Sequence, residues 1–104
     1  MMIKEKYDFN YFKGSTIGEL KIIIKGKEKT KDSIFNFINM QNNNSETLLM
    51  HAIMDNDLEK VRFLIENGAD INILDKNGSS AFDYAIEINN EEIMKILDKH
   101  KNQF

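Results

Sequence analysis

A period of 33 residues runs through the second half of this chain. Residues 38–65 and residues 71–98 align without a gap, and eight of the 28 aligned positions are identical. The identical pairs are Ile38 and Ile71, Asn39 and Asn72, Asn44 and Asn77, Ala52 and Ala85, Ile53 and Ile86, Asn56 and Asn89, Glu59 and Glu92, and Leu64 and Leu97. Repetition at this spacing is typical of solenoids, because a single small unit cannot bury its own apolar face.

Each copy has the pattern of two short helices joined by a tight turn. Apolar residues recur at helical spacing within residues 49–65 and again within residues 82–97. The residues expected to cap these helices carry side-chain acceptors, and they are Thr47, Asp57, Ser80 and Asn90. Asn56 and Asn89 lie between the helices, where a tight reversal needs a residue that tolerates the left-handed conformation.

The stretch ENGADINILDKNG, residues 66–78, connects the two copies. Gly68 is expected to adopt a positive φ and to end the helix of residues 58–66. A turn is predicted around Asp75 to Gly78, because Asx residues and glycine are the usual turn formers. We therefore interpret this stretch as a spacer between stacked units.

With these motifs the chain resembles the ankyrin repeat family. The segments SETLLMHAI, DNDLEKVRFLIEN and GADINILD lie on the family pattern, and the second copy starts at GSSAFDYAI. The resemblance implies an all-α fold, a short ankyrin-repeat solenoid of helix-turn-helix units with hairpin-like loops, about three units including divergent caps. The proline of the family pattern is replaced by Leu48 and Ala81, and this departure implies a less stable stack.

Two repeats bury too little apolar surface, so the N-terminal part is expected to supply a third unit. Four apolar residues match the second helix of the first copy at an offset of 41, namely Ile17, Leu20, Ile23 and Ile24. The extra residues are placed in GKEKTKDSIFNF as a long loop, with an additional turn of helix in DSIFNFI as the alternative. The single domain thus divides into residues 1–41, a divergent N-terminal capping repeat with a lysine-rich insertion; 42–74, an ankyrin repeat; and 75–104, an ankyrin repeat acting as C-terminal cap.

Charge is divided unequally along the chain. Residues 1–31 have a net charge of +4 and residues 32–104 a net charge of −7, within the total of −3. The acidic part would repel nucleic acid and attract a basic surface. Since the family implies protein binding without catalysis, we expect a stand-alone inhibitor, of the immunity or anti-defence type, that covers a basic surface of another protein. A generic adaptor or scaffold is the first alternative.

Nucleic-acid binding through the N-terminal lysines is the second alternative. The lysines concerned are Lys21, Lys25, Lys27, Lys29 and Lys31. Phosphate contacts would make the affinity steeply salt-dependent. Because no arginine or aromatic residue is interleaved among the last three lysines, we interpret them as a solvated face.

The predicted partner-binding residues lie on the inner helices and loop tips that form a concave surface in ankyrin stacks. They are His51, Met54, Asp55, Lys76, Asn77, Tyr84, Glu87 and Ile88. An exposed Tyr84 and Ile88 beside two carboxylates would form an aromatic anchor with an acidic rim. The alternative is that these residues only pack or solvate the helices. Met50 and Met94 are expected in the core.

No pattern points to catalysis, a cofactor or a metal site. The two histidines, His51 and His100, have no second ligand at metal-binding spacing, and cysteine is absent. Glu91 and Glu92 fit the dipole of a helix N-terminus better than acid-base chemistry. The longest aliphatic run is III at residues 22–24, so neither a signal peptide nor a membrane span is predicted. We expect a cytoplasmic monomer, or a weak dimer formed through an apolar face of the N-terminal unit.

Overall fold

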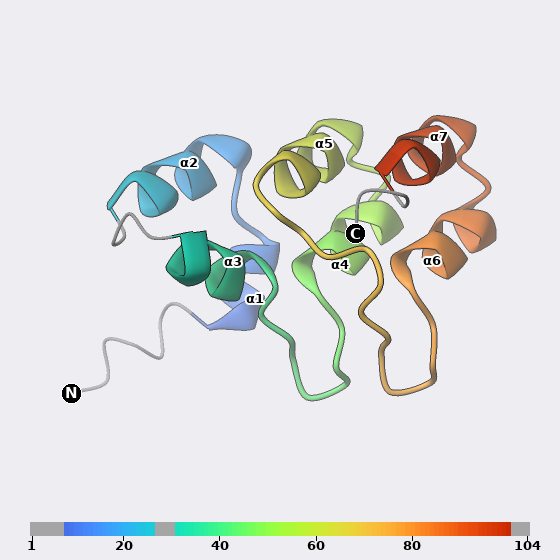
Figure 1. Ribbon diagram of the computed structural model, residues 1–104, viewed down its shortest axis with the longest axis horizontal. Helices are drawn as coiled ribbons and strands as arrows, with labels where there is room; N and C mark the ends of the chain where they lie inside the picture. Colours follow the sequence, from blue (N-terminus) through green and yellow to red (C-terminus); the bar gives the residue numbers. More distant parts are fainter. Residues whose placement is uncertain (1–7, 27–30, 101–104) are drawn as a thin grey trace.

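Helices make up the fold in the computed structural model, which describes residues 8–26 and 31–100. In chain order the helices are α1 (Phe9–Lys13), α2 (Ile17–Gly26), α3 (Lys31–Ile38), α4 (Leu48–Met54), α5 (Leu58–Glu66), α6 (Ala81–Ile88) and α7 (Glu91–His100). Three pairs stand in a row, α1 with α2, α4 with α5 and α6 with α7 (Figure 1). The all-α solenoid expected from the repeat is confirmed.

The helices begin and end where the predicted caps and turns lie. Thr47 caps the start of α4 and accepts a hydrogen bond from the Met50 amide. Ser80 caps the start of α6 in the same way and accepts from the Asp83 amide. The other two predicted caps also accept amide hydrogen bonds, Asp57 from Lys60 and Asn90 from Ile93. Asn56, Asn89, Gly68 and Gly78 have φ values of 59°, 63°, 101° and 83°. Each of these four adopts the positive φ that its turn requires.

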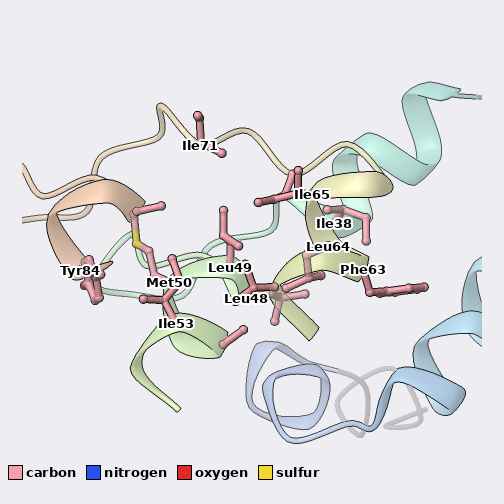
Figure 2. Packing of buried hydrophobic residues seen from close by; sticks show 14 of the residues in the cluster. Ile38, Leu48, Leu49, Met50, Ile53, Phe63, Leu64, Ile65, Ile71 and Tyr84 are labelled. Atoms are coloured by element: carbon pink, nitrogen blue, oxygen red, sulfur yellow. The ribbon is translucent and has the colours of Figure 1, made fainter. Parts of the chain in front are cut away.

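The first helices of the three pairs, α1, α4 and α6, form one row, and the second helices, α2, α5 and α7, form another. The core lies between these two rows. Leu48, Leu49, Ile53 and Leu64 are at most 1% exposed, and Figure 2 shows them among the packed side chains of the core. Met50 is also 1% exposed, so its predicted place in the core is confirmed. Met94 is half-buried and packs against the core from α7.

The N-terminal unit departs from the expected long loop. Residues 31–38 form α3, as the alternative in DSIFNFI anticipated, and the helix is longer than one turn. This helix buries Phe37 and Ile38. The Phe37 and Phe12 rings pack edge to face, with their centroids 4.8 Å apart. A helix satisfies the backbone polar groups of the segment internally while it brings these side chains into the core. Lys27 and Lys29 lie outside the described residues, and the unit boundaries after residues 41 and 74 stay predictions.

Polar contacts also join successive units. Lys60 is 6% exposed, and its Nζ donates to the carbonyl oxygen of Lys13 at 2.8 Å. Burial lowers the pKa of Lys60, while nearby Asp57 and Asp55 act in the opposite direction. Because a buried ammonium needs an acceptor, this bond fixes α5 against the end of α1.

Candidate functional site

A polar network joins the loop before α4 to the loop before α6. Glu46 Oε1 accepts from Asn42 Nδ2 at 2.8 Å and lies 2.9 Å from His51 Nε2. The Tyr84 hydroxyl donates to Asp75 Oδ2 at 2.6 Å and to Glu46 Oε2 at 3.4 Å. Side chains from both repeats therefore hold the two loops in a fixed relation.

The pKa shifts in the network follow from these hydrogen bonds. The bond from Asn42 lowers the pKa of Glu46, and the bond from Tyr84 lowers the pKa of Asp75. Burial, followed by the bond to Asp75, raises the pKa of Tyr84. The hydroxyl of Tyr84 therefore stays protonated, and its single hydrogen goes mainly to the nearer carboxylate, that of Asp75.

The expected exposure of Tyr84 is wrong. This side chain is 9% exposed, since its ring packs into the core and its hydroxyl is used by the network. His51 is also largely covered, with a side chain 13% exposed and a ring 5.3 Å from that of Phe9. Both residues support the loops. Glu46, which the sequence pattern did not single out, is the carboxylate that connects them.

Four of the predicted residues lie exposed at the C-terminal ends of α4 and α6. We name Met54, Asp55, Glu87 and Ile88 the turn-edge patch. Met54 is 41% exposed and Ile88 37%, and both carboxylates are exposed. The two helices pack against each other, so the patch includes side chains from neighbouring repeats.

The turns beside the patch are themselves joined. Asn90 Nδ2, after α6, donates to Asn56 Oδ1, after α4. Lys60, Asp55 and Asp57 are close enough for their charges to interact. The turn edge is therefore acidic, with two apolar side chains within it and a fixed backbone beneath.

Lys76 and Asn77 lie apart from the turn-edge patch. Both are exposed in the loop that precedes α6, whereas Glu87 and Ile88 lie at the far end of that helix. An α-helix of this length separates its ends by about 12 Å. The Lys76 amide donates to the carbonyl oxygen of Asn44 at 2.9 Å, so this loop tip rests on its neighbour. The structure thus divides the predicted site into two parts.

The lysines of the N-terminal unit form a different surface. Lys21 and Lys25 are exposed on α2 and line a hollow of about 300 Å³ together with Ile24, Phe63 and Asn67. Lys31 begins α3. The described part of the chain contains no cluster of three or more His, Asp or Glu side chains suited to a metal ion. Nor does it contain a helix with the length and apolar character needed to cross a bilayer.

Comparison with known proteins gives the same family along most of the chain. A family model described as "Ankyrin repeats (3 copies)" matches residues 15–103. The nuclear factor NF-kappa-B p105 subunit of Gallus gallus is 35% identical over 66 residues, 64% of this chain and 7% of that protein. Ankyrin repeat protein 14 of Vaccinia virus is 42% identical over 65 residues, 62% of this chain and 27% of that protein.

A giant-virus protein shows the same degree of similarity. The putative ankyrin repeat protein L92 of Acanthamoeba polyphaga mimivirus is 39% identical over 61 residues, 58% of this chain and 15% of that protein. The aligned residues thus span less than a third of each of these curated relatives.

Proposed function

Since the chain belongs to the ankyrin repeat family, a non-enzymatic interaction fold, we propose that it binds another protein through the turn-edge patch. The partner presents a basic surface, and the chain acts as an inhibitor by covering that surface. The observation that carries the proposal is the pairing of Met54 and Ile88 with Asp55 and Glu87 on two helices in contact.

Each kind of side chain in the patch has a separate part in binding. Met54 and Ile88 offer apolar area that loses water on contact, and such desolvated centres carry most of the energy of an interface. Asp55 and Glu87 select a partner with lysine or arginine opposite them and steer its approach. The net charge of −7 on residues 32–104 extends this steering beyond the patch.

The rigidity of the frame favours recognition with little ordering cost. The network of Glu46, Tyr84 and Asp75 holds the loops, and the contact between Asn56 and Asn90 holds the turns. A surface that is already ordered loses less conformational entropy when it binds.

The test is an affinity pull-down from the lysate of the native host at moderate salt, with Asp55→Lys/Glu87→Lys beside the wild type. We expect a basic protein that the wild type retains and the double variant loses. Asp32→Lys/Glu66→Lys is the matched control, because it makes the same change in charge at exposed sites on α3 and α5. Circular dichroism checks that all variants fold alike.

Two results would contradict the proposal. One is retention of the same protein by Asp55→Lys/Glu87→Lys, and the other is the absence of any specifically retained protein. Replacement of Lys25, Lys27 and Lys29 tests the nucleic-acid alternative, since it should leave protein binding unchanged. Steeply salt-dependent binding of DNA or RNA that disappears in this variant would favour the alternative.

A further inference from the structure

Asparagine is followed by glycine at two places in this chain, Asn67 with Gly68 and Asn77 with Gly78. Glycine shields its own amide nitrogen less than any other residue does, because it has no Cβ. In such a pair the glycine nitrogen can attack the side-chain carbonyl carbon of the asparagine. The two pairs are alike in sequence, so the structure around each pair decides whether it reacts.

Hydrogen bonds hold the first pair at the end of α5. Asn67 Nδ2 donates to the carbonyl oxygen of Phe63 at 2.8 Å, so the side-chain amide is bound to the preceding turn of the helix. The carbonyl oxygen of Gly68 accepts from Asn39 Nδ2 at 3.0 Å. Asn67 and Gly68 are both only partly exposed. An attack on Asn67 therefore requires the end of α5 to open first.

The second pair lies in the loop before α6 and is held by fewer contacts. Asn77 and Gly78 are both exposed. In the part of the chain that the structure describes, the Asn77 side chain makes no hydrogen bond, and its backbone amide donates to Asp75 Oδ1 at 2.9 Å. A Cβ placed on Gly78 would meet no atom within 4 Å beyond its chain neighbours. The surroundings of this pair are therefore open enough for a ring to form.

The glycine amides themselves do not distinguish the two pairs. The Gly78 amide donates to the carbonyl oxygen of Asp75 at 3.0 Å, and the Gly68 amide donates to that of Ile65 at 3.2 Å. Either bond must break before the nitrogen can attack. The difference lies in what else must open, which is an exposed loop tip at Gly78 and the end of a packed helix at Gly68.

The equivalent loop of the first copy offers an internal comparison. Asn44 is exposed and has the same repeat position as Asn77, but Ser45 follows it. The φ values of Ser45 and Gly78 are similar, 63° and 83°. Because the Ser45 side chain crowds its amide nitrogen, Asn44 has the exposure without the glycine, whereas Asn67 has the glycine without the exposure. Among these three asparagines, Asn77 alone combines both.

We infer that Asn77 is a site of spontaneous covalent modification, at which the folded chain converts asparagine to a mixture of aspartate and isoaspartate. The Gly78 nitrogen loses its proton to solvent and attacks Asn77 Cγ, the bond from Cγ to Nδ2 breaks, and Nδ2 leaves as ammonia. Water then opens the succinimide ring. Opening at Cγ gives aspartate, and opening at the main-chain carbonyl carbon gives isoaspartate. The reaction consumes water, releases ammonia and needs no oxidant or reductant.

The product alters the loop edge of the stack. It adds a carboxylate next to Lys76 and two residues from Asp75, so like charges meet within one turn. In isoaspartate the main chain also gains a carbon atom, at the loop whose Lys76 amide rests on the carbonyl oxygen of Asn44. The turn-edge patch lies at the other end of the helices, so this inference does not depend on the partner proposed above.

The experiment is incubation of the folded full chain at mildly alkaline pH, followed by tryptic digestion and mass spectrometry. Cleavage after Arg62 and Lys76 places Asn67 and Asn77 on different peptides. We expect the conversion of amide to acid to be roughly a hundredfold faster at Asn77 than at Asn67, because more hydrogen bonds must break at the helix end. Asn44 should also react more slowly than Asn77. In urea the rate at Asn67 should approach that at Asn77, while Asn44 stays slow.

A second readout detects the isoaspartate itself. Protein isoaspartyl methyltransferase with labelled S-adenosylmethionine methylates isoaspartate and leaves ordinary aspartate unlabelled. Asn77→Gln should remove most of the label, because the longer side chain would have to close a less favourable six-membered ring. Asn67→Gln is the matched control and should leave the label unchanged. Equal rates at Asn67 and Asn77 in the folded chain, or labelling that persists in Asn77→Gln, overturns the proposal.

Discussion

Truncating two equivalent isoleucines should give very different losses of stability. Ile53→Ala and Ile86→Ala remove the same carbon atoms from equivalent positions of α4 and α6. Ile53 is 0% exposed, so the lost transfer free energy is about 2.4 kcal/mol. A residual cavity raises the expected total to about 3–4 kcal/mol. Ile86 is 52% exposed, so its truncation loses only about half of the transfer free energy and leaves no closed cavity. The expected loss for Ile86→Ala is therefore about 1 kcal/mol.

Equilibrium unfolding in urea, followed by far-UV circular dichroism at low protein concentration, measures both losses. The slope of the transition should be equal in the two variants, because truncation does not change the surface exposed on unfolding by much. In thermal melts a loss of 1 kcal/mol lowers the Tm of a domain of this size by roughly 4–8 °C. Ile53→Ala should therefore melt at a temperature well below that of Ile86→Ala.

Equal losses at the two positions would refute the reasoning. A loss at Ile86 as large as at Ile53 would mean that the side chain at the end of the stack is covered in solution by the chain itself. The burial of Ile53 would then not depend on the helix pair α6 and α7 that follows it.

Two further predictions concern the loops and the helix ends. Because the Tyr84 bond lowers the pKa of Asp75 from 3.8, the carboxylate stabilises the fold above that pH and loses this contribution as the pH falls through its folded value. Tyr84→Phe should therefore flatten the decline in stability as the pH falls below 3.8, and an unchanged acid profile in urea unfolding would count against the network. Gly68→Ala should cost about 1 kcal/mol or more, since Gly68 has a φ of 101°. Gly18→Ala in α2 should instead stabilise by about 0.5 kcal/mol; thermal melts that shift in the same direction for both would contradict this.

The sequence alone was sufficient for the helix ends, the turns and the repeat. Thr47, Ser80 and Asn90 cap through hydrogen bonds to amides three residues later, so residue type and spacing predict them. Gly68 and Asn89 follow from the same local chemistry. The 33-residue period needed only the order of residues.

Long-range packing decided the rest. Tyr84 is buried because its hydroxyl reaches Glu46, 38 residues away, and no local pattern records that contact. Residues 31–38, for which the sequence left a loop and a helical turn open, form a helix whose Phe37 packs against Phe12, 25 residues earlier in the chain.

The contrast between Ile53 and Ile86 shows the physical reason most directly. They are the same residue in the same position of the repeat, and each follows an alanine. One is fully buried and the other half exposed, because a helix pair follows the first within the described structure and none follows the second. Burial depends on what packs on a side chain, and that is decided by the stack as a whole and not by the segment that carries the residue.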